Sequence, residues 1–435
     1  MNHGFIWGVS TASYQIEGAA REDGRGLSIW DSFCRQPGSI ANGDTGDIAC
    51  DHYHRFLDDI ALMRDLGVGA YRFSVAWPRV LPDGRGRANE AGLAFYDRLV
   101  DALLAAGIEP WLCLYHWDLP QALQDVGGWT SRDSAGWFAD YAELIARRYG
   151  SKVKRFATFN EPSVFTLLGY GLGRHAPGAK DSAILLQAIH NVNLAHGAAV
   201  DVLRSLVPAV SVGAIHCQQP CVPSTSQDKA AAELLDAYWN GAFADPQCLA
   251  SYPPLLMQQI ESYVRRGDLG RISRPVDWFG LNHYCPLFVK ADPASPLGFA
   301  TAEPPAGLAC SGIGWPIDPN AFRDTLIAAH KRYRLPIYVL ENGIGSFDKP
   351  DDNGRIVDDH RIDYLRNYTA AISSAIAAGA DVRGYFVWSL LDNFEWASGY
   401  DPRFGLVYVD YATQRRSPKS SFYWYAELIR GKRRS

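Results

Sequence analysis

Eight short runs rich in β-branched and aromatic residues recur along the chain, and this recurrence constrains its fold more than any other feature. The runs cover residues 5–10, 71–75, 109–115, 153–159, 210–215, 276–281, 337–340 and 384–388. Amphipathic segments lie between them. In residues 52–66, apolar side chains repeat at three- and four-residue spacing, with charged side chains on the other face. Near-continuous apolar strands that alternate with helices indicate a parallel sheet covered by helices.

Eight such repeats predict an α/β fold, a single closed (β/α)₈ TIM barrel, rather than an open doubly wound sheet. Further helical patterns cover residues 89–106, 131–149, 183–206, 319–333 and 358–378. No linker or low-complexity tract interrupts the chain, so we expect one catalytic barrel domain over residues 1–435. Long segments rich in Gly, Pro, Asp and Ser, residues 34–50, 217–228, 285–318 and 343–357, are expected to form the loops that shape the site.

Charge and cysteine content exclude several classes of function. The net charge of −5 provides no footprint for nucleic acid, and we interpret the basic end, residues 430–434, as a solvated tail. No apolar run approaches the ~20 residues of a membrane span, and the start lacks the charged and apolar regions of a secretory signal. The eight cysteines are scattered, so we expect reduced thiols in a cytoplasmic protein.

Two glutamates stand at the carboxyl ends of predicted strands. Glu161 follows the run 153–159, and Glu341 follows the run 337–340, before a turn glycine. Although the two residues are far apart in sequence, the strand ends of a closed barrel meet at one mouth. We therefore expect two poorly hydrated carboxyl groups to face each other across that mouth.

Other polar and aromatic residues occupy equivalent positions. Those that we expect at the same mouth are Gln15, Arg72, His116, Asn160, Asn282, Tyr284, Trp388, Glu395 and Trp396. Amides, imidazole, carboxylates and indoles together suit a polyhydroxylated ligand, whose hydroxyls need donors and acceptors and whose ring face stacks on aromatic planes. Two carboxyl groups of unequal proton affinity are what glycoside hydrolysis requires. Arg72 and the Tyr284 hydroxyl could hold Glu341 ionised, while burial and that nearby anion raise the proton affinity of Glu161.

Each of these residues taken alone also has a structural interpretation. A strand-end glutamate often pairs with an arginine, and a single histidine or tryptophan is commonly part of the core. Residues 51–54 (DHYH) could suggest a metal site, but His52 and His54 would not share a helical face, and we predict no metal and no cofactor. The placement of both glutamates on independent strands favours the catalytic interpretation.

At these residues the chain resembles glycoside hydrolase family one, the retaining β-glucosidases and β-galactosidases. The likeness runs nearly end to end through residues 5–8, 13–18, 71–79, 116–120, 158–162, 338–343 and 388–396. The last of these, WSLLDNFEW, is the most characteristic. Gly345 stands where the family commonly has alanine, and His283 where a second aromatic residue often precedes Tyr284, so the local pocket shape is expected to differ.

The resemblance implies roles for particular residues. Glu161 would be the acid/base and Glu341 the nucleophile, supported by Arg72, Asn282 and Tyr284. The groups that would bind the sugar are Gln15, His116, Asn160, Tyr284, Glu395 and Trp396, with Trp388 as the stacking platform. Phe404 would close the pocket near C6, and Trp315 would border the aglycone.

These residues predict a retaining β-glucosidase that removes terminal non-reducing β-D-glucosyl residues from cellobiose, short β-glucosides and aryl β-glucosides. Negative charge at Glu395 would disfavour a 6-phosphorylated sugar. A preference for β-galactosides or β-fucosides, or for transfer of glucose to acceptors other than water, stays open as an alternative within the family. A metal-dependent barrel hydrolase and a non-catalytic sugar-binding barrel are the alternatives from other classes.

Overall fold

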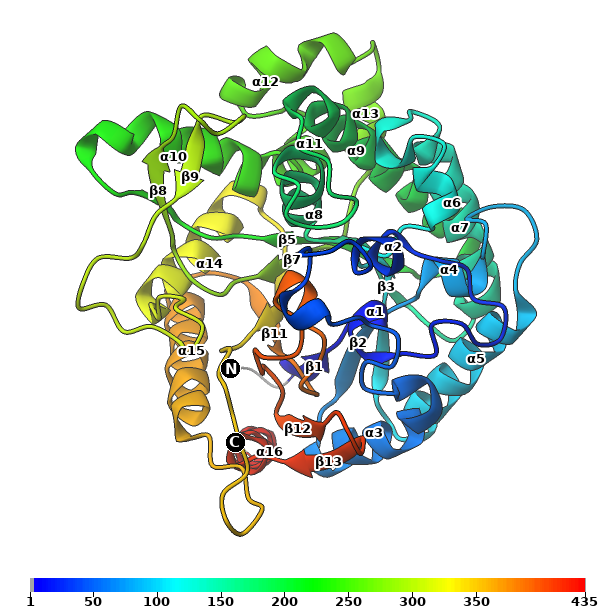
Figure 1. The fold of residues 1–435 in the computed structure, drawn as a ribbon, viewed down its shortest axis with the longest axis vertical. Helices are drawn as coiled ribbons and strands as arrows, with labels where there is room; N and C mark the ends of the chain where they lie inside the picture. Colours follow the sequence, from blue (N-terminus) through cyan, green and yellow to red (C-terminus); the bar gives the residue numbers. More distant parts are fainter. Residues whose placement is uncertain (1–3, 435) are drawn as a thin grey trace.

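The computed structural model describes residues 4–434, and these form a closed barrel of eight parallel strands. In their order around the barrel the strands are β1 (Ile6–Ser10), β11 (Val382–Trp388), β10 (Ile337–Asn342), β7 (Trp278–Asn282), β5 (Ser211–Cys217), β4 (Arg155–Asn160), β3 (Glu109–Tyr115) and β2 (Ala70–Ser74). Strand β2 pairs again with β1, which closes the barrel. Figure 1 shows the strands near the middle of the molecule, with helices around them. The predicted TIM barrel is confirmed.

Each predicted strand run corresponds to one barrel strand, with shifts of one to two residues at most ends. Two of these shifts matter for the site. The run predicted to end at residue 159 forms β4, which continues to Asn160, and the run 337–340 forms β10, which continues through Glu341 to Asn342. Both segments are buried. The ladder to the neighbouring strands therefore fixes the backbone of Glu341 itself.

The six predicted helical segments are also present. They form α3 (His52–Leu66), α5 (Glu90–Ala105), α7 (Ser134–Tyr149), α9 (Ser182–Leu206), α14 (Pro319–Tyr333) and α15 (Asp359–Ala377). The interpretation of the basic end as a tail was wrong in one respect. Residues 420–434 form the helix α16, which packs against α3 and α15, and the Tyr425 hydroxyl donates to the Gly8 carbonyl at 3.1 Å. Apolar residues such as Phe422 and Ile429 bury one side of this helix, while Arg430 is exposed.

Two predicted loops contain regular structure that the periodicity did not indicate. The strands β6 (Cys221–Pro223), β8 (Leu287–Ala291) and β9 (Phe299–Thr301) form a small sheet beside α10 (Lys229–Asp236). This sheet lies outside the barrel, on the same side of the molecule as α14 (Figure 1). The chain between β12 (Val407–Asp410) and β13 (Arg415–Pro418) turns back as an antiparallel hairpin.

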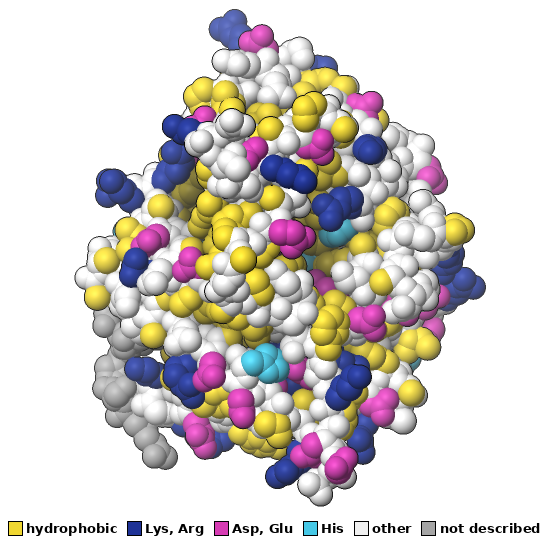
Figure 2. Space-filling model, turned by 60° about the vertical axis from the view of Figure 1, so that its left-hand side comes forward, with side chains coloured by type: hydrophobic (Ala, Val, Ile, Leu, Met, Phe, Trp, Pro, Cys, Tyr) yellow, Lys and Arg dark blue, Asp and Glu magenta, His cyan; other side chains and the backbone are white. Residues whose placement is uncertain are grey.

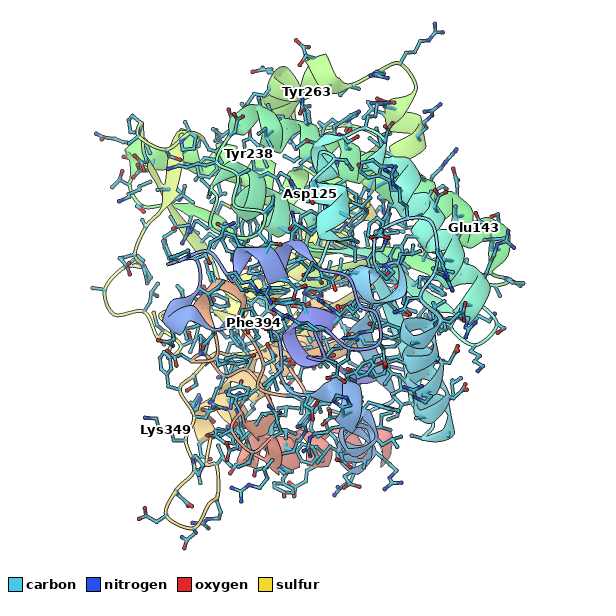
Figure 3. The ribbon with its side chains drawn as sticks, turned by 45° about the vertical axis from the view of Figure 1, so that its right-hand side comes forward. Asp125, Glu143, Tyr238, Tyr263, Lys349 and Phe394 are labelled. Atoms are coloured by element: carbon cyan, nitrogen blue, oxygen red, sulfur yellow. The ribbon has the colours of Figure 1, made fainter. Side chains whose placement is uncertain are left out.

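Large side chains fill the barrel interior beneath its mouth. Trp111 lies at the centre of this layer, with ring centroids 5.4 Å from Trp278, 4.8 Å from Tyr338 and 5.3 Å from Phe386. Because the interior is packed in this way, no channel runs through the barrel, and a ligand can bind only at the mouth. Figure 3 shows Phe394, from the segment after β11, near the middle of the molecule, whereas Lys349 lies on a loop near its lower edge.

None of the helices in the described residues combines the length and hydropathy that crossing a membrane requires. All eight cysteines of the sequence lie within the described residues, and all eight are free thiols. The first three residues of the start, where the sequence predicts no secretory signal, lie outside the described residues.

Candidate active site

A cavity of about 950 Å³ opens at the carboxyl ends of the barrel strands. Eight of the predicted site residues line it: His116, Glu161, Tyr284, Trp315, Glu341, Trp388, Glu395 and Trp396. The other five, Gln15, Arg72, Asn160, Asn282 and Phe404, lie behind this wall and contact residues that line it. The structure thus brings the whole predicted set together, with eight residues on the wall and five directly behind it.

Glu341 is held on both carboxylate oxygens. Its side chain is 4% exposed, Arg72 forms an ion pair with Oε1, and the Tyr284 hydroxyl donates to Oε2 at 2.6 Å. A buried carboxylate with a guanidinium on one oxygen and a hydroxyl donor on the other is favoured in its ionised form. Arg72 is itself buried, so its charge acts in a region from which water is excluded.

Glu161 lies in a different environment. It is 5% exposed, and its Oε1 accepts a hydrogen bond of 2.9 Å from Asn282 Nδ2. Burial, followed by the negative charge of Glu341, raises the pKa of Glu161 to about 8. At neutral pH Glu161 is therefore suited to donate a proton beside Glu341, which is the arrangement that general acid catalysis beside a nucleophile requires.

Several bulky residues at the mouth have left-handed backbone conformations. Trp117 has φ of 80°, Glu161 has φ of 45° and Trp396 has φ of 53°. Such values are unfavourable for large side chains, and they persist only where surrounding contacts hold them. The Glu161 N–H donates to the Ile215 carbonyl at 2.8 Å, and the Trp117 indole N–H donates to the Asn160 carbonyl at 2.9 Å. These contacts aim the side chains into the cavity.

Polar side chains behind the two glutamates are linked to one another. Asn282 Nδ2 donates to Asn160 Oδ1 at 3.1 Å, and the His116 ring lies 3.2 Å from Asn160 Nδ2 and 3.1 Å from Arg72 Nη1. Burial and the Arg72 charge lower the pKa of His116 well below its usual value. The ring is therefore neutral, and because Arg72 can only donate, its Nδ1 is the acceptor and its Nε2 carries the proton. The amide oxygens of Gln15 and Asn282 have no hydrogen-bond partner among the described residues, so they are free to accept from ligand hydroxyls.

Aromatic rings form the remaining walls. The His116 ring lies parallel to both Trp388 and Trp396, with centroids 5.9 Å away from each. Trp315, which is 37% exposed, lies at the opening. Its ring centroid is 5.4 Å from that of Tyr284 and 5.8 Å from that of Phe404. The inner tryptophans can stack on the apolar face of a sugar ring, while Trp315 can contact only what extends toward solvent.

The surroundings of Glu395 affect the charge that the sequence predicts for it. Burial and the Glu341 charge raise the pKa of Glu395 to about 8, although Gln15 Nε2 donates to Oε2 at 3.5 Å. Burial therefore favours the protonated form of this carboxyl group at neutral pH. The sequence predicts that a negative charge on Glu395 repels a 6-phosphate. This repulsion is weaker when the Glu395 carboxyl group is protonated.

Among the lining residues that the sequence did not indicate, Cys217 lies nearest the chemistry. It ends β5, lines the cavity and forms a hydrogen bond with Glu161. The position of Cys217 at the carboxyl end of a barrel strand is the same signal that located the other residues. A cysteine is not a typical sugar-binding residue, so the sequence alone did not indicate it. The Cys217 thiol also donates to Gln219 Oε1 at 3.2 Å.

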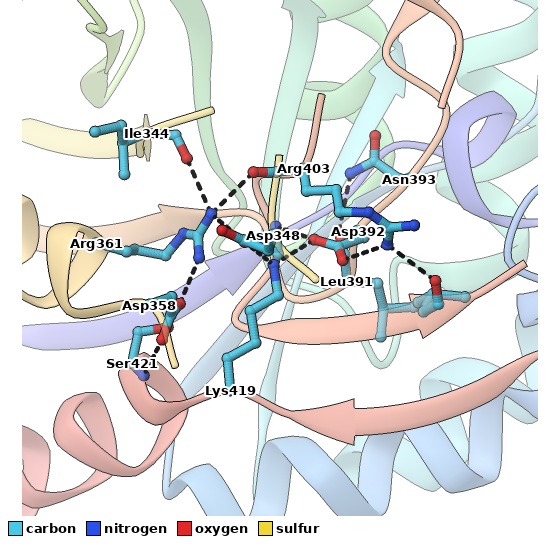
Figure 4. Close-up of polar contacts among 12 residues, drawn as sticks. Ile344, Asp348, Asp358, Arg361, Leu391, Asp392, Asn393, Arg403, Lys419 and Ser421 are labelled. Atoms are coloured by element: carbon cyan, nitrogen blue, oxygen red, sulfur yellow. Dashed lines mark hydrogen bonds and ion pairs between the residues drawn. The ribbon is translucent and has the colours of Figure 1, made fainter. Parts of the chain in front are cut away.

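A second set of charged residues lies beside the site and holds its loops together (Figure 4). We refer to Asp348, Asp358, Arg361, Asp392, Arg403 and Lys419 as the ionic cluster. Asp392 accepts from Lys419 Nζ at 2.7 Å, from Arg403 Nη1 at 2.8 Å and from the Gly405 N–H at 2.9 Å. The last two contacts flank Phe404, so Asp392 fixes the segment that places Phe404 against Trp388.

Within residues 4–434 no group of three or more potential ligands is arranged to hold a metal ion. The histidines of residues 51–54 have other partners: His52 Nδ1 lies 2.7 Å from Asp59, and His54 Nδ1 lies 2.6 Å from Asp51. As expected from helical geometry, the two side chains take part in separate interactions.

A TIM barrel whose mouth holds two buried carboxyl groups of unequal proton affinity, surrounded by amides and tryptophans, has the site of a glycoside hydrolase. Comparison with protein-family models matches residues 1–434 to glycosyl hydrolase family 1. The chain belongs to glycosyl hydrolase family 1.

Individual relatives agree with this assignment. The chain is 43% identical over 434 residues to beta-glucosidase A of Thermotoga maritima, covering 98% of this chain and 97% of the relative. It is also 43% identical over 454 residues to a bifunctional beta-D-glucosidase/beta-D-fucosidase of Bifidobacterium breve, with coverage of 98% and 97%. Among solved structures, the Thermotoga maritima beta-glucosidase in complex with glucoimidazole matches with a TM-score of 0.94 and 42% identity, covering 99% of this chain and 98% of that one.

Proposed function

We propose that this chain is a retaining β-glucosidase in which Glu341 is the nucleophile and Glu161 the general acid and base. The observation that carries the proposal is the contrast between the two buried carboxyl groups. Arg72 and Tyr284 hold Glu341 on both oxygens, while burial and the Glu341 charge raise the pKa of Glu161 to about 8. One group is thus suited to attack a carbon and the other to donate a proton.

In the first step Glu341 attacks the anomeric carbon while Glu161 donates its proton to the glycosidic oxygen. The bond between that carbon and oxygen breaks, the alcohol leaves, and a glycosyl ester forms on Glu341. Esterification removes the charge of Glu341, which is one cause of the raised pKa of Glu161. Glu161 is then a carboxylate that accepts a proton from water while the water oxygen attacks the anomeric carbon and frees Glu341.

The remaining residues would bind and orient the sugar. Gln15, His116, Asn160, Glu395 and Trp396 would meet its hydroxyls, and Trp388 would stack on its ring. The unpartnered Gln15 Oε1 supports this, because it leaves an acceptor for a hydroxyl, and the neutral His116 ring has an Nε2–H donor, because its Nδ1 accepts from Arg72. Arg72, Asn282 and Tyr284 would support the nucleophile. Phe404 would close the pocket near C6, and the exposed Trp315 would contact the aglycone.

The substrates that we propose are cellobiose, short β-glucosides and aryl β-glucosides with a terminal non-reducing glucosyl residue. Relatives named as β-glucosidases or as 1,4-beta-D-glucan glucohydrolases support this choice. The relative named as a bifunctional glucosidase and fucosidase supports β-fucosides as a second substrate class. β-Galactosides, or transfer of glucose to acceptors other than water, are further candidates within the same mechanism.

Product stereochemistry tests the mechanism directly. Hydrolysis of 4-nitrophenyl β-glucoside, followed by proton NMR from the first minute, should yield β-glucose before mutarotation produces the α anomer. Initial release of α-glucose would contradict a covalent intermediate on Glu341, since a single displacement inverts the anomeric centre. Initial rates in a chelator provide the control for a metal-dependent barrel hydrolase, and we expect them to be unchanged.

We also propose that the whole chain acts as one catalytic domain and that it works in the cytoplasm. The pairing of β1 with β11 and the packing of α16 on α3 join the two ends of the chain, which supports the first point. Free thiols at all eight cysteines support the second, because an oxidising compartment favours disulfides. Fractionation of the cells tests the compartment. Activity in the cell extract, with none in the membrane fraction or the culture medium, would support the cytoplasm.

A further inference from the structure

We propose that Cys217 is a positioning residue for Glu161, with a thiol that donates to the Glu161 carboxylate once the glycosyl ester has formed and to Gln219 Oε1 while Glu161 is protonated. The inference rests on the proposed function and deepens it, because it names a group that stabilises Glu161 as a base. No bond to sulfur forms or breaks, since the thiol keeps its proton and only turns about its Cβ–Sγ bond.

Strand register places Cys217 beside Glu161. The Glu161 N–H donates to the Ile215 carbonyl of β5 at 2.8 Å, and side chains two residues apart on a strand point to the same face. Because Ile215 belongs to the packed layer inside the barrel, Cys217 at the end of β5 also points inward, where it lines the cavity and forms a hydrogen bond with Glu161. Asn282, which pairs with Cys217 across β5 and β7, donates to Glu161 Oε1 at 2.9 Å. Two neighbouring strands thus each direct one donor at the same carboxyl group.

The thiol stays protonated in this environment. Burial, followed by the negative charge of Glu161, raises the pKa of Cys217 well above its usual value, so the group is a donor and not a nucleophile or a base. Cys217 is 2% exposed and Glu161 is 5% exposed. On the face shown in Figure 2, hydrophobic side chains line a hollow between scattered charges. Where water is scarce a hydrogen bond to a charged group is strengthened, so even a weak donor such as a thiol affects the carboxylate.

Gln219 provides the alternative acceptor. Its Nε2 donates to the Cys285 carbonyl at 2.7 Å, and its backbone N–H donates to Asn240 Oδ1 at 3.0 Å, so the residue is held at both ends. Its Oε1 then faces Cys217 and accepts from the thiol at 3.2 Å. A thiol carries one hydrogen, so donation to Gln219 and donation to Glu161 exclude each other.

The charge of Glu161 decides which acceptor the thiol takes. In the first step Glu161 is an acid, and the thiol donates to Gln219. After the ester has formed, Glu161 is a carboxylate, which is a stronger acceptor than an amide oxygen, and the thiol turns to it. Burial, followed by the charge of Glu341, raises the pKa of Glu161, and the hydrogen bond from Cys217 acts in the opposite direction. When Glu161 accepts the proton of water, the thiol returns to Gln219.

Cys217→Ala and Cys217→Ser form a matched pair that tests the inference, because alanine and serine have similar volumes and differ in the donor. In Cys217→Ala the alkaline decline of kcat/KM for phenyl β-glucoside should move upward from about 8 by about half a pH unit, an approximately threefold change in the ionised fraction of Glu161. In Cys217→Ser, whose hydroxyl is a better donor, the decline should lie at or below its wild-type position. Coincident declines in the two variants would overturn the inference.

Gln219→Met should produce the opposite shift. Methionine has a similar length but no amide oxygen, so the thiol would donate to Glu161 alone and the decline should move downward. A general disturbance of the site would not give opposite signs in the two variants, and an upward shift in Gln219→Met would overturn the inference. If Cys217→Ala is poorly folded, Gln219→Met provides the test. Cys248→Ala, on α11 (Ala244–Leu249) and outside the cavity lining, is the control and should leave the decline unchanged.

A measurement without turnover checks the same shifts. The infrared band of the protonated Glu161 carboxyl group, obtained as the difference from the matching Glu161→Gln variant, should titrate with the same order of midpoints. Midpoints that coincide in Cys217→Ala and Cys217→Ser would contradict only this inference. Absence of 4-nitrophenol release from 4-nitrophenyl β-glucoside by the wild-type chain would instead contradict the proposed function itself.

Discussion

The molecule contains two buried groups of charged side chains, and they differ in how their charges balance. In the ionic cluster, three aspartates meet two arginines and a lysine. In the cavity wall lie Glu161, Glu341 and Glu395, of which only Glu341 forms an ion pair with Arg72, and burial keeps His116 neutral. One group pairs every carboxylate with a cation, while the other has more carboxyl groups than cations.

The imbalance has a direct chemical consequence. Burial tends to raise the pKa of Asp348, yet the charges of Arg361 and Lys419 outweigh it and lower the pKa to about 2. In the cavity, burial and the Glu341 charge act in the same direction on Glu161 and raise its pKa to about 8. Similar burial thus produces a fixed anion in one place and a proton donor in the other, because the neighbouring charges and hydrogen-bond donors differ.

Removing the one carboxylate that Arg72 holds should have the largest effect. We expect Glu341→Gly to lower kcat for 4-nitrophenyl β-glucoside by on the order of 10⁴-fold or more, because no nucleophile remains. Added azide should restore turnover by attacking the anomeric carbon in the vacated space, and the glucosyl azide should have the inverted, α configuration. The rate of nitrophenol release and the NMR spectrum of the product measure both effects. Unchanged activity in Glu341→Gly would contradict the role of Glu341.

Removing the proton donor should have a smaller effect that depends on the leaving group. We expect Glu161→Gln to lower kcat/KM for phenyl β-glucoside by about 10²–10⁴-fold, and far less for 2,4-dinitrophenyl β-glucoside, whose leaving group needs no proton. Initial rates on both substrates provide the measurement. Equal losses of kcat/KM on the two substrates would contradict the role of Glu161 as the general acid.

The sequence predicts those parts of this contrast that depend on local patterns. The strand ends were predicted within two residues because apolar runs mark buried parallel strands, and the barrel then brought Glu161 and Glu341 to one mouth. Family motifs located residues such as Gln15 and Trp396, which periodicity alone cannot assign. The structure places all of them at or directly behind the cavity wall.

What the sequence could not predict depends on contacts between distant segments. Lys419 meets Asp348 and Asp392, which lie 71 and 27 residues away, and no local pattern signals such a meeting. The small sheet of β6, β8 and β9 was missed because its strands are short and only partly buried. The raised pKa of Glu395 likewise follows from its burial near Glu341, a three-dimensional property that no motif records.

The balanced group should respond to a lost charge through stability. Lys419→Met keeps the length of the side chain but leaves Asp348 and Asp392 without their shared cation, so we expect a loss of about 3–5 kcal/mol in the free energy of unfolding. Denaturant titration followed by tryptophan fluorescence measures it. Lys152→Met, which breaks an exposed pair with Asp101, is the control and should cost about 0–1 kcal/mol. Similar losses in both variants would contradict a stabilising role for the ionic cluster.

The smallest effect is a change with pH, and it tests the unbalanced group without mutation. General acid catalysis needs Glu161 protonated, so kcat/KM for phenyl β-glucoside should fall as the pH rises through about 8, by tenfold for each unit beyond it. Because the pKa of Glu395 is also raised to about 8, loss of sugar binding could produce a similar decline. The leaving group separates the two causes. With 2,4-dinitrophenyl β-glucoside a decline due to Glu161 should disappear, whereas one due to Glu395 should remain. The same decline on both substrates would move the titrating group from the acid to the sugar-binding carboxyl.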